Sequence, residues 1–221
     1  MRFASLGSET YRDRSAAGAV LADQLTEYRQ QPDAIVLGLV RGGVPVAAEV
    51  TRRLELPLDV LVVRKLGVPW VPEVAFGALG PKGVRVLNTA IAARLDPADI
   101  DEVTEREARE VTRREAAYRG RRPPLDLTGR TAIVVDDGLA TGATARAAIT
   151  VARRMGANKV VVAVPVGAVE AVNWLSEEAD QVVCPLTPAD FGAVSRFYDD
   201  FHQVSDAEVR TLLDAASGAE S

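Results

Sequence analysis

The sequence contains one cysteine, Cys184, and one histidine, His202. A single cysteine excludes a disulfide within the chain, and one thiol with one imidazole cannot supply the ligand cluster of a zinc site. The same scarcity argues against hydrolysis by a Ser–His or Cys–His pair, because these two residues would have to serve in every such role. We interpret Cys184 as a buried residue of a β-strand.

Long apolar runs are also missing. The longest one, residues 160–169, is well short of the roughly 18 residues that span a bilayer. The N-terminus has charged residues with no apolar stretch between them, which argues against a signal peptide. With 48% hydrophobic and 26% charged residues among 221, the composition is that of a globular protein. We therefore expect a soluble, cytoplasmic protein with one main core and no membrane partner.

Lysine is scarce and the charge balance is acidic. Only three of the 26 cationic residues are lysines, namely Lys65, Lys82 and Lys159, which makes the position of each one informative. The formal net charge is −5, whereas a non-specific nucleic-acid binder usually has an excess of basic residues. A nucleic-acid partner is therefore disfavoured, although the arginines of residues 113–122 leave a local basic face.

Apolar runs typical of strands alternate with helical patterns through most of the chain. The predicted strands cover residues 34–40, 58–63, 131–135, 160–164 and 181–184, and the predicted helices cover 15–30, 44–54, 144–155 and 168–178. This alternation predicts βαβ units with right-handed crossovers and a parallel sheet, so the expected fold class is α/β.

Two segments interrupt the alternation. Residues 65–83 contain three prolines and four glycines, which predicts an irregular lid or binding loop, with an edge hairpin as the alternative. Residues 97–120 form a highly charged predicted helix, with Asp96 as N-cap, Pro97 at the first position and Gly120 as the stop. We interpret it as a solvated helix against the edge of the sheet, with a dimer contact as the alternative.

The most informative stretch is IVVDDGLATGATAR, residues 133–146. A buried strand delivers Asp136 and Asp137 at its carboxyl end, where open α/β sheets bind their ligands. A loop of small residues follows and enters a helix, so that residues 141–144 present successive N–H groups and two hydroxyls to one anion. The loop has no lysine and is therefore not the GxxxxGK[ST] loop that binds nucleoside triphosphates. Two acids before an anion cradle suit a sugar phosphate.

This stretch resembles the 5-phosphoribosyl-1-pyrophosphate (PRPP) motif of type I phosphoribosyltransferases, which is a hydrophobic strand, an acidic pair and a T-G-x-T-like loop. One position departs from the family pattern. Gly138 stands where the family usually has a larger aliphatic residue, and we expect this glycine to loosen the loop.

Two further segments are similar to the same family. GLVRGG, residues 38–43, looks like its pyrophosphate loop and especially like xanthine-guanine phosphoribosyltransferase, although a glycine pair alone also serves tight packing. VVRK, residues 62–65, is similar to a segment of adenine phosphoribosyltransferase, although a lysine at a strand end is often only solvated. The resemblance covers roughly residues 10–185. It is strongest to a group of predicted phosphoribosyltransferases that share the RGGVPVA, VVRKLG and VDDGLATGAT segments.

The resemblance implies a type I phosphoribosyltransferase-like fold, with a mainly parallel five-stranded sheet flanked by helices. The core would occupy residues 10–185, with residues 65–83 as a flexible loop. Residues 186–221 would form a small hood, a terminal helix from Asp206 and a disordered tail. The family reaction transfers the 5-phosphoribosyl group from Mg²⁺-bound PRPP to a nitrogen acceptor and releases pyrophosphate. The resemblance also suggests nucleotide salvage and a homodimer.

The resemblance implies a role for each matching residue. Asp136 and Asp137 would be catalytic, hold the ribose hydroxyls and bind Mg²⁺ mostly through substrate and water. The 5′-phosphate would lie on Ala140, Thr141, Gly142, Ala143 and Thr144. The pyrophosphate would lie on Arg41, Gly42, Gly43, Arg64 and Lys65, with Lys65 as the catalytic cation.

The acceptor does not follow from these motifs. The 6-oxopurine enzymes of the family have an aspartate three residues after the acidic pair, and this chain has Ala140 there. The adenine enzymes have a glutamate in the flexible loop at about the position of Leu79, and Glu73 is the nearest acid to it in this chain. Neither purine assignment therefore transfers to this chain.

Four aromatic residues lie close together in the predicted hood, namely Phe191, Phe197, Tyr198 and Phe201. They suit either stacking on a base or a small separate core, and their spacing favours the core. Two other kinds of protein remain as alternatives to an enzyme. A PRPP-binding regulator of the same fold would bind without turnover, whereas a purely structural module would leave the three phosphate-type loops unexplained.

Overall fold

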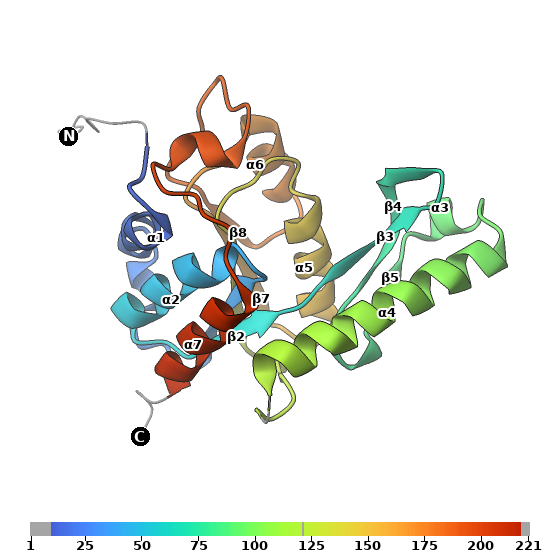
Figure 1. The fold of residues 1–221 in the computed structure, drawn as a ribbon, viewed down its shortest axis with the longest axis horizontal. Coiled ribbons are helices and arrows are strands. Elements are labelled where there is room, and N and C mark those ends of the chain that lie inside the picture. The colour runs from blue at the N-terminus through green and yellow to red at the C-terminus, as the bar shows by residue number, and fades with distance from the viewer. Residues whose placement is uncertain (1–9, 121, 218–221) are drawn as a thin grey trace.

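The computed structural model of the chain describes residues 10–120 and 122–217, apart from the side chains of Pro72, Glu73 and Ser217. The predicted disordered tail covers residues 217–221; Ser217 is instead the last residue of a helix, and residues 218–221 lie outside the described residues, as does the side chain of Glu73. Figure 1 shows two parts, an α/β core and an arm that projects from it. Among the described residues no helix has both the length and the apolar content needed to cross a membrane.

The core is built on a parallel five-stranded sheet, as the sequence predicts, and its strands lie in the order β2-β1-β6-β7-β8. The strands are β1 (Ala34–Leu39), β2 (Leu58–Leu61), β6 (Thr131–Val135), β7 (Lys159–Ala163) and β8 (Gln181–Val183). The three central strands are almost wholly buried because their apolar residues are covered on both faces.

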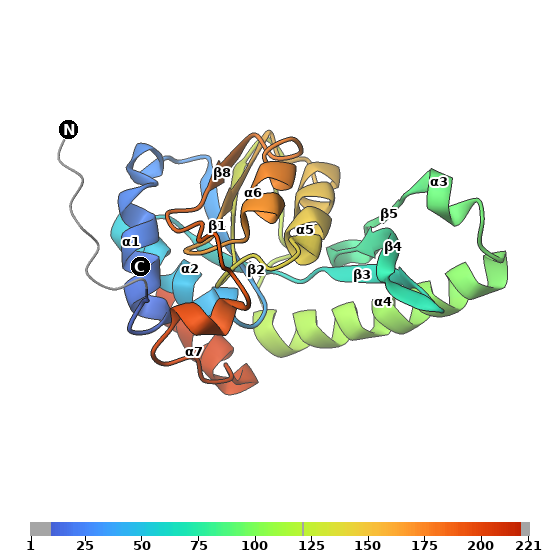
Figure 2. The ribbon, with the colours of Figure 1, turned by 90° about the horizontal axis from the view of Figure 1, so that it is seen from above.

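Helices cover the two faces of this sheet (Figure 2). One face packs on α1 (Arg14–Asp23) and α2 (Gly43–Leu54), and the other packs on α5 (Ala143–Arg154) and α6 (Val169–Leu175). Side chains along β6 alternate between the faces, with Ile133 in the first core and Val134 in the second. The last helix, α7 (Asp206–Ser217), begins where the sequence predicts and packs on the first core through Val209 and Leu213.

The first helix is shorter than predicted. Residues 15–30 were expected to be helical, but α1 ends at Asp23 and a short 3₁₀ turn, η1 (Thr26–Tyr28), follows. The change of direction buries both Leu25 and Tyr28 in the same core. Burial of these two side chains thus stabilises the chain more than continued helical hydrogen bonding would.

The arm begins with an antiparallel sheet, which corrects the expected irregular loop. Its strands are β3 (Arg64–Val68), β4 (Val71–Leu79) and β5 (Arg85–Leu87), followed by the short helix α3 (Thr89–Ala92). The alternative, an edge hairpin, is correct as to the hairpin, but β3 and β4 belong to a separate three-stranded sheet and not to the edge of the main sheet. Strands form here despite the prolines because Pro69 and Pro81 lie outside the strands. At these positions the missing backbone N–H removes no hydrogen bond between strands.

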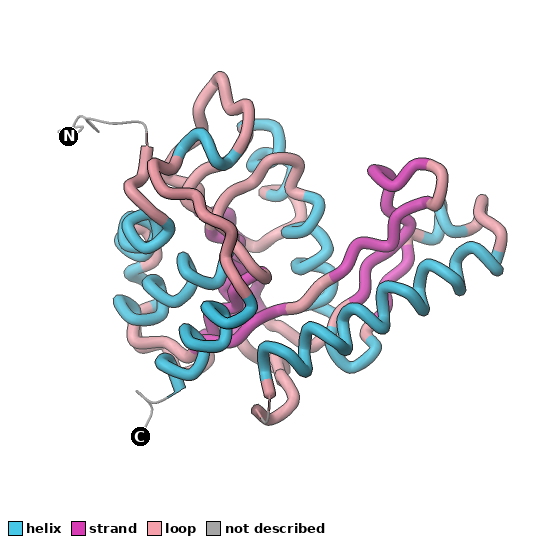
Figure 3. The backbone as a smooth tube through the Cα atoms, in the orientation of Figure 1, coloured by secondary structure: helices cyan, strands magenta, loops and turns pink. Residues whose placement is uncertain are grey.

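The long helix α4 (Pro97–Arg119) returns along the arm to the core (Figure 3). Its start and stop are as predicted, with Asp96 accepting from the backbone N–H of Ala98 at 2.9 Å and with Gly120 as C-cap at φ +53°. Its apolar stripe, Val103 and Val111, joins the core cluster that includes Phe76 of the hairpin. The helix therefore lies along the hairpin, and its C-terminal end reaches the edge of the main sheet, where Arg119 binds Asp59 of β2.

Candidate functional site

Two loops meet at the carboxyl edge of the main sheet. Gly38 of β1 lies opposite Val135 of β6, so the loops that follow these neighbouring strands leave the sheet side by side. A Cβ atom added at Gly42 would lie 2.1 Å from Oδ2 of Asp137, and one at Gly43 would lie 2.4 Å from the carbonyl oxygen of Val135. Only glycine allows this approach, so the packing interpretation of the glycine pair is correct at both positions. The structure thus brings together the predicted pyrophosphate loop and the acidic pair.

The carboxylate of Asp137 is bound by Arg14 of α1. The Nε and Nη2 atoms of Arg14 each lie 2.9 Å from Oδ2 of Asp137. The arginine is 6% exposed, and its Nη1 atom donates to the carbonyl oxygen of His202 at 2.8 Å. Sequence reasoning missed this residue, because nothing local separates Arg14 from the many other arginines of the chain.

Burial controls the electrostatics of the acidic pair. Burial, and then the charge of Asp137, raise the pKa of Asp136 well above its usual range. Burial also raises the pKa of Asp137, although Arg14 acts in the opposite direction. Two carboxylates in a site of low solvent access favour a bound cation or hydroxyl donors that compensate their charge.

The same acids are fixed by hydrogen bonds. The backbone N–H of Asp137 donates to Oδ1 of Asp136 at 2.9 Å. The hydroxyl of Tyr198 donates to the carbonyl oxygen of Asp137 at 2.6 Å, and burial raises the pKa of that phenol. The acidic loop is therefore held in one conformation by residues from α1 and from the segment after β8.

The predicted phosphate loop opens the helix α5. Gly142 is its N-cap in the left-handed region at φ +72°, and the hydroxyl of Thr141 accepts from the backbone N–H of Ala143 at 3.4 Å. Ala140, Thr141 and Thr144 are exposed around these first N–H groups. The loop is anchored by Leu139, which donates to the carbonyl oxygen of Val166 and accepts from Ala168, both at 2.9 Å. The first turn of α5 can thus hold one anion beside the acidic pair.

Gly138 does not loosen the loop as the sequence suggested. A Cβ atom at this position would lie 2.7 Å from Cγ1 of Val194 and 3.2 Å from Cγ1 of Val166. The side chain of Val194, in the 3₁₀ turn η3 (Val194–Phe197), fills the space that a larger residue would occupy. The loop is therefore packed rather than loose.

The three predicted pyrophosphate cations lie in different surroundings. Arg41 follows β1 and has its Nη1 atom 3.5 Å from Oδ1 of Asp206, the first residue of α7. Arg64 donates to Glu107 of α4 at 2.7 Å, so its guanidinium is held within the arm. Lys65 lines a cavity of about 470 Å³ between the hairpin and α5. Arg41 thus lies near the carboxyl end of β1, whereas Arg64 forms an ion pair with Glu107 in the arm.

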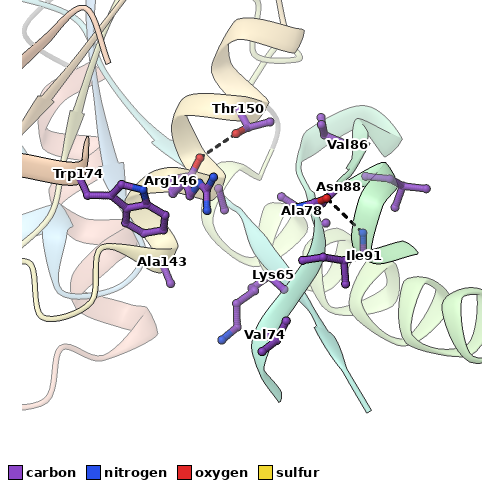
Figure 4. A pocket seen from close by; sticks show the side chains of 14 residues that line it. Lys65, Val74, Ala78, Val86, Asn88, Ile91, Ala143, Arg146, Thr150 and Trp174 are labelled. Carbon is purple, nitrogen blue, oxygen red and sulfur yellow. Dashed lines mark hydrogen bonds between the residues drawn. The ribbon is translucent and has the colours of Figure 1, made fainter. Parts of the chain in front are cut away.

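The cavity beside Lys65 reaches the start of the phosphate loop helix. Figure 4 shows Lys65 and Val74 on the side of the hairpin, with Ala143, Arg146 and Trp174 on the side of the core. The guanidinium of Arg146 lies 4.3 Å from the ring centroid of Trp174. Lys65 therefore stands across the cavity from the first residue of α5.

The aromatic residues of the predicted hood pack on one another and on α1. Phe191 and Phe197 stack at 5.6 Å between ring centroids, and Tyr198 and Phe201 lie at 5.1 Å. Phe197 and Tyr198 are each 6% exposed, and Ala17 of α1 belongs to the same cluster. These rings form the small separate core that their spacing favours.

The acidic pair suits a magnesium ion only in part. Asp136 uses Oδ1 to accept a backbone N–H, and Asp137 uses Oδ2 for Arg14. Within the described part of the chain, no group of three or more His, Cys, Asp or Glu residues is placed to hold a metal ion. The remaining carboxylate oxygens fit a hard cation that takes most of its ligands from phosphate oxygens and water.

Comparisons with known proteins identify the family of the chain. A model of the phosphoribosyl transferase domain matches residues 9–202. "Putative phosphoribosyl transferase Rv0571c" of Mycobacterium tuberculosis is 52% identical over 208 residues, which are 93% of this chain and 47% of that protein. This chain thus spans about half the length of that relative. The crystal structure of TT1426 from Thermus thermophilus is 43% identical with a TM-score of 0.84, over 92% of this chain and 97% of that one.

Proposed function

The chain belongs to the phosphoribosyl transferase domain family, and on that premise we propose that it transfers the 5-phosphoribosyl group of PRPP to a nitrogen acceptor. The observation that carries this proposal is the meeting of three elements at one edge of the sheet. These are the loop of Arg41 to Gly43, the acidic pair and the exposed first turn of α5. Together they match the pyrophosphate, the ribose and the 5′-phosphate of one donor molecule.

The binding roles follow from the chemistry of each group. The carboxylates of Asp136 and Asp137 accept hydrogen bonds from the two vicinal ribose hydroxyls. The N–H groups and hydroxyls of residues 140–144 hold the 5′-phosphate at the positive end of α5. Gly42 and Gly43 let the backbone approach the pyrophosphate, and Arg41 supplies a guanidinium to it.

The reaction needs little covalent help from the protein. The acceptor nitrogen attacks C1′, the bond from C1′ to the pyrophosphate oxygen breaks, and pyrophosphate leaves with the electron pair. The transition state has oxocarbenium character, so the protein mainly has to stabilise charge and exclude water. We assign this task to Arg41 and to Lys65 of the hairpin; the predicted role of Arg64 requires that its ion pair with Glu107 open.

Magnesium belongs to the same proposal. When bound, Mg²⁺ neutralises the charge that develops on the leaving pyrophosphate. Asp136 and Asp137 would hold it mostly through substrate oxygens and water. A hood and terminal helix at residues 186–217, a homodimer and a cytoplasmic location complete the proposed assignment.

Donor binding is the first test. Titration calorimetry with PRPP and Mg²⁺ should show binding to the wild-type chain and a loss of affinity in Asp137→Asn. Asp126→Asn serves as the control, because Asp126 is exposed and caps only the turn at Thr128. Absence of PRPP binding in the folded wild-type chain would contradict the proposal.

Turnover is tested by pyrophosphate release in pools of purines, pyrimidines, pyridine carboxylates and amines. Release in one pool would support the transferase and identify its acceptor class. Tight PRPP binding without release in every pool would favour the regulatory protein instead.

A further inference from the structure

We propose that Arg14 is a positioning residue for Asp137, holding one carboxylate oxygen so that the other is presented to the ribose. This inference rests on the proposed function and deepens the description of its donor site. It assigns a role to a residue of α1, outside the three motifs that match the family.

The distribution of bonds on the carboxylate carries the inference. Both Nε and Nη2 of Arg14 lie 2.9 Å from Oδ2 of Asp137, and no hydrogen bond within the described residues is found at Oδ1. The loop after β1 packs on the same oxygen, since the position of a Cβ at Gly42 is 2.1 Å from Oδ2 and 3.3 Å from Oδ1. One oxygen of Asp137 is thus used by the protein, and the other is left for a ligand.

A second buried ion pair in the same chain shows the contrast. Arg119 of α4 binds Asp59 of β2 with one nitrogen on each oxygen, Nε to Oδ1 at 3.0 Å and Nη2 to Oδ2 at 2.9 Å. The two side chains are 9% and 11% exposed, close to the 7% and 15% of Arg14 and Asp137. The Arg119–Asp59 pair, which lies outside the site, therefore binds both carboxylate oxygens. In contrast, both nitrogens of Arg14 bind the single oxygen Oδ2 of Asp137.

Arg14 is itself held from the opposite side. Its Nη1 atom donates to the carbonyl oxygen of His202 at 2.8 Å, and its guanidinium carbon lies 4.0 Å from the ring centroid of Phe201. The main chain of Asp137 is fixed separately by the hydroxyl of Tyr198 at 2.6 Å. The carboxylate consequently has its orientation set before the donor binds, which reduces the cost of ordering it in the complex.

The test compares two arginine variants that remove matched ion pairs. PRPP affinity in the presence of Mg²⁺ is measured by calorimetry, and thermal unfolding is followed for the same proteins. We expect Arg14→Gln to weaken PRPP binding by about 10-fold or more, the effect of losing a charge-assisted hydrogen bond. Arg119→Gln should lower the unfolding temperature comparably and leave PRPP affinity unchanged, because Asp59 lies outside the site.

Two further variants separate positioning from folding. Arg14→Lys keeps the charge and should recover part of the affinity. In a double-mutant cycle, Arg14→Gln added to Asp137→Asn should weaken binding little further, because both act through the same carboxylate. Additive losses in the cycle, or equal losses of affinity in Arg14→Gln and Arg119→Gln, would show a merely structural role.

The outcomes distinguish this inference from the proposed function. A wild-type chain that binds PRPP while Arg14→Gln binds it equally well would overturn the positioning role alone. A folded wild-type chain that does not bind PRPP would overturn both.

Discussion

Gly42 and Asp137 lie so close that no side chain fits between them, since a Cβ atom on Gly42 would stand 2.1 Å from Oδ2 of Asp137. We expect Gly42→Ala to displace the carboxylate or the loop and to cost about 1–3 kcal/mol of stability, as overpacking does. PRPP affinity should fall at the same time. Gly129→Ala is the control, because Gly129 has φ +71° with open space around it and tests backbone strain alone. An unchanged affinity in Gly42→Ala would contradict the close contact.

The contact between Gly138 and Val194 makes a second prediction. Gly138→Ala should destabilise the protein, because its Cβ would lie 2.7 Å from the side chain of Val194. Val194→Ala removes that methyl contact, so the double variant should be more stable than the sum of the two single changes predicts. Urea unfolding of the four proteins measures this coupling. Strict additivity would mean that the two positions do not touch.

Lys65 makes a third prediction. If Lys65 stabilises the leaving pyrophosphate, Lys65→Met should slow pyrophosphate release by about 100-fold, the usual effect of removing one such group. Lys82→Met is the matched control, because Lys82 is exposed in the turn after β4. The measurement is single-turnover release at saturating PRPP, with the acceptor found in the pool assay. Equal rates in the two variants would remove Lys65 from the proposed mechanism.

Cys184 should be chemically inert in the folded protein. Burial raises the pKa of its thiol to about 12, and the Sγ atom lies 3.3 Å from the carbonyl oxygen of Leu186. Since the thiolate is the reactive form, a disulfide reagent near neutral pH should label it slowly in buffer and quickly in denaturant. Rapid labelling without denaturant would indicate that the edge at β8 opens readily.

The main sheet could be predicted from the sequence because each of its strands is marked by a short run of neighbouring apolar residues. The apolar runs of β1 and β6 are buried on both faces, and such runs are readable without knowledge of their neighbours. The same holds for the acidic pair and for residues 140–144, whose order along the chain already places them at a strand end and a helix start.

Contacts between distant residues could not be predicted in this way. Arg14 and Asp137 are separated by 123 positions, and no pattern around either residue indicates that they meet. The side chain of Val194 fills the space beside Gly138 for the same reason, from 56 positions further along the chain. In the hairpin, the abundance of proline and glycine indicated a loop, whereas two of the prolines lie just outside the strands.

The pairing of the two ends of the family-matched region limits when the site can form during synthesis. Tyr11 pairs with Tyr198 along the backbone, and Arg14 reaches the carbonyl oxygen of His202 across 188 positions. A nascent chain that has emerged only as far as β8 already holds all three phosphate-type loops, yet it lacks the residues that fix Arg14. In a nascent chain of this length the orientation of Arg14, and with it that of the Asp137 carboxylate, is therefore not yet set.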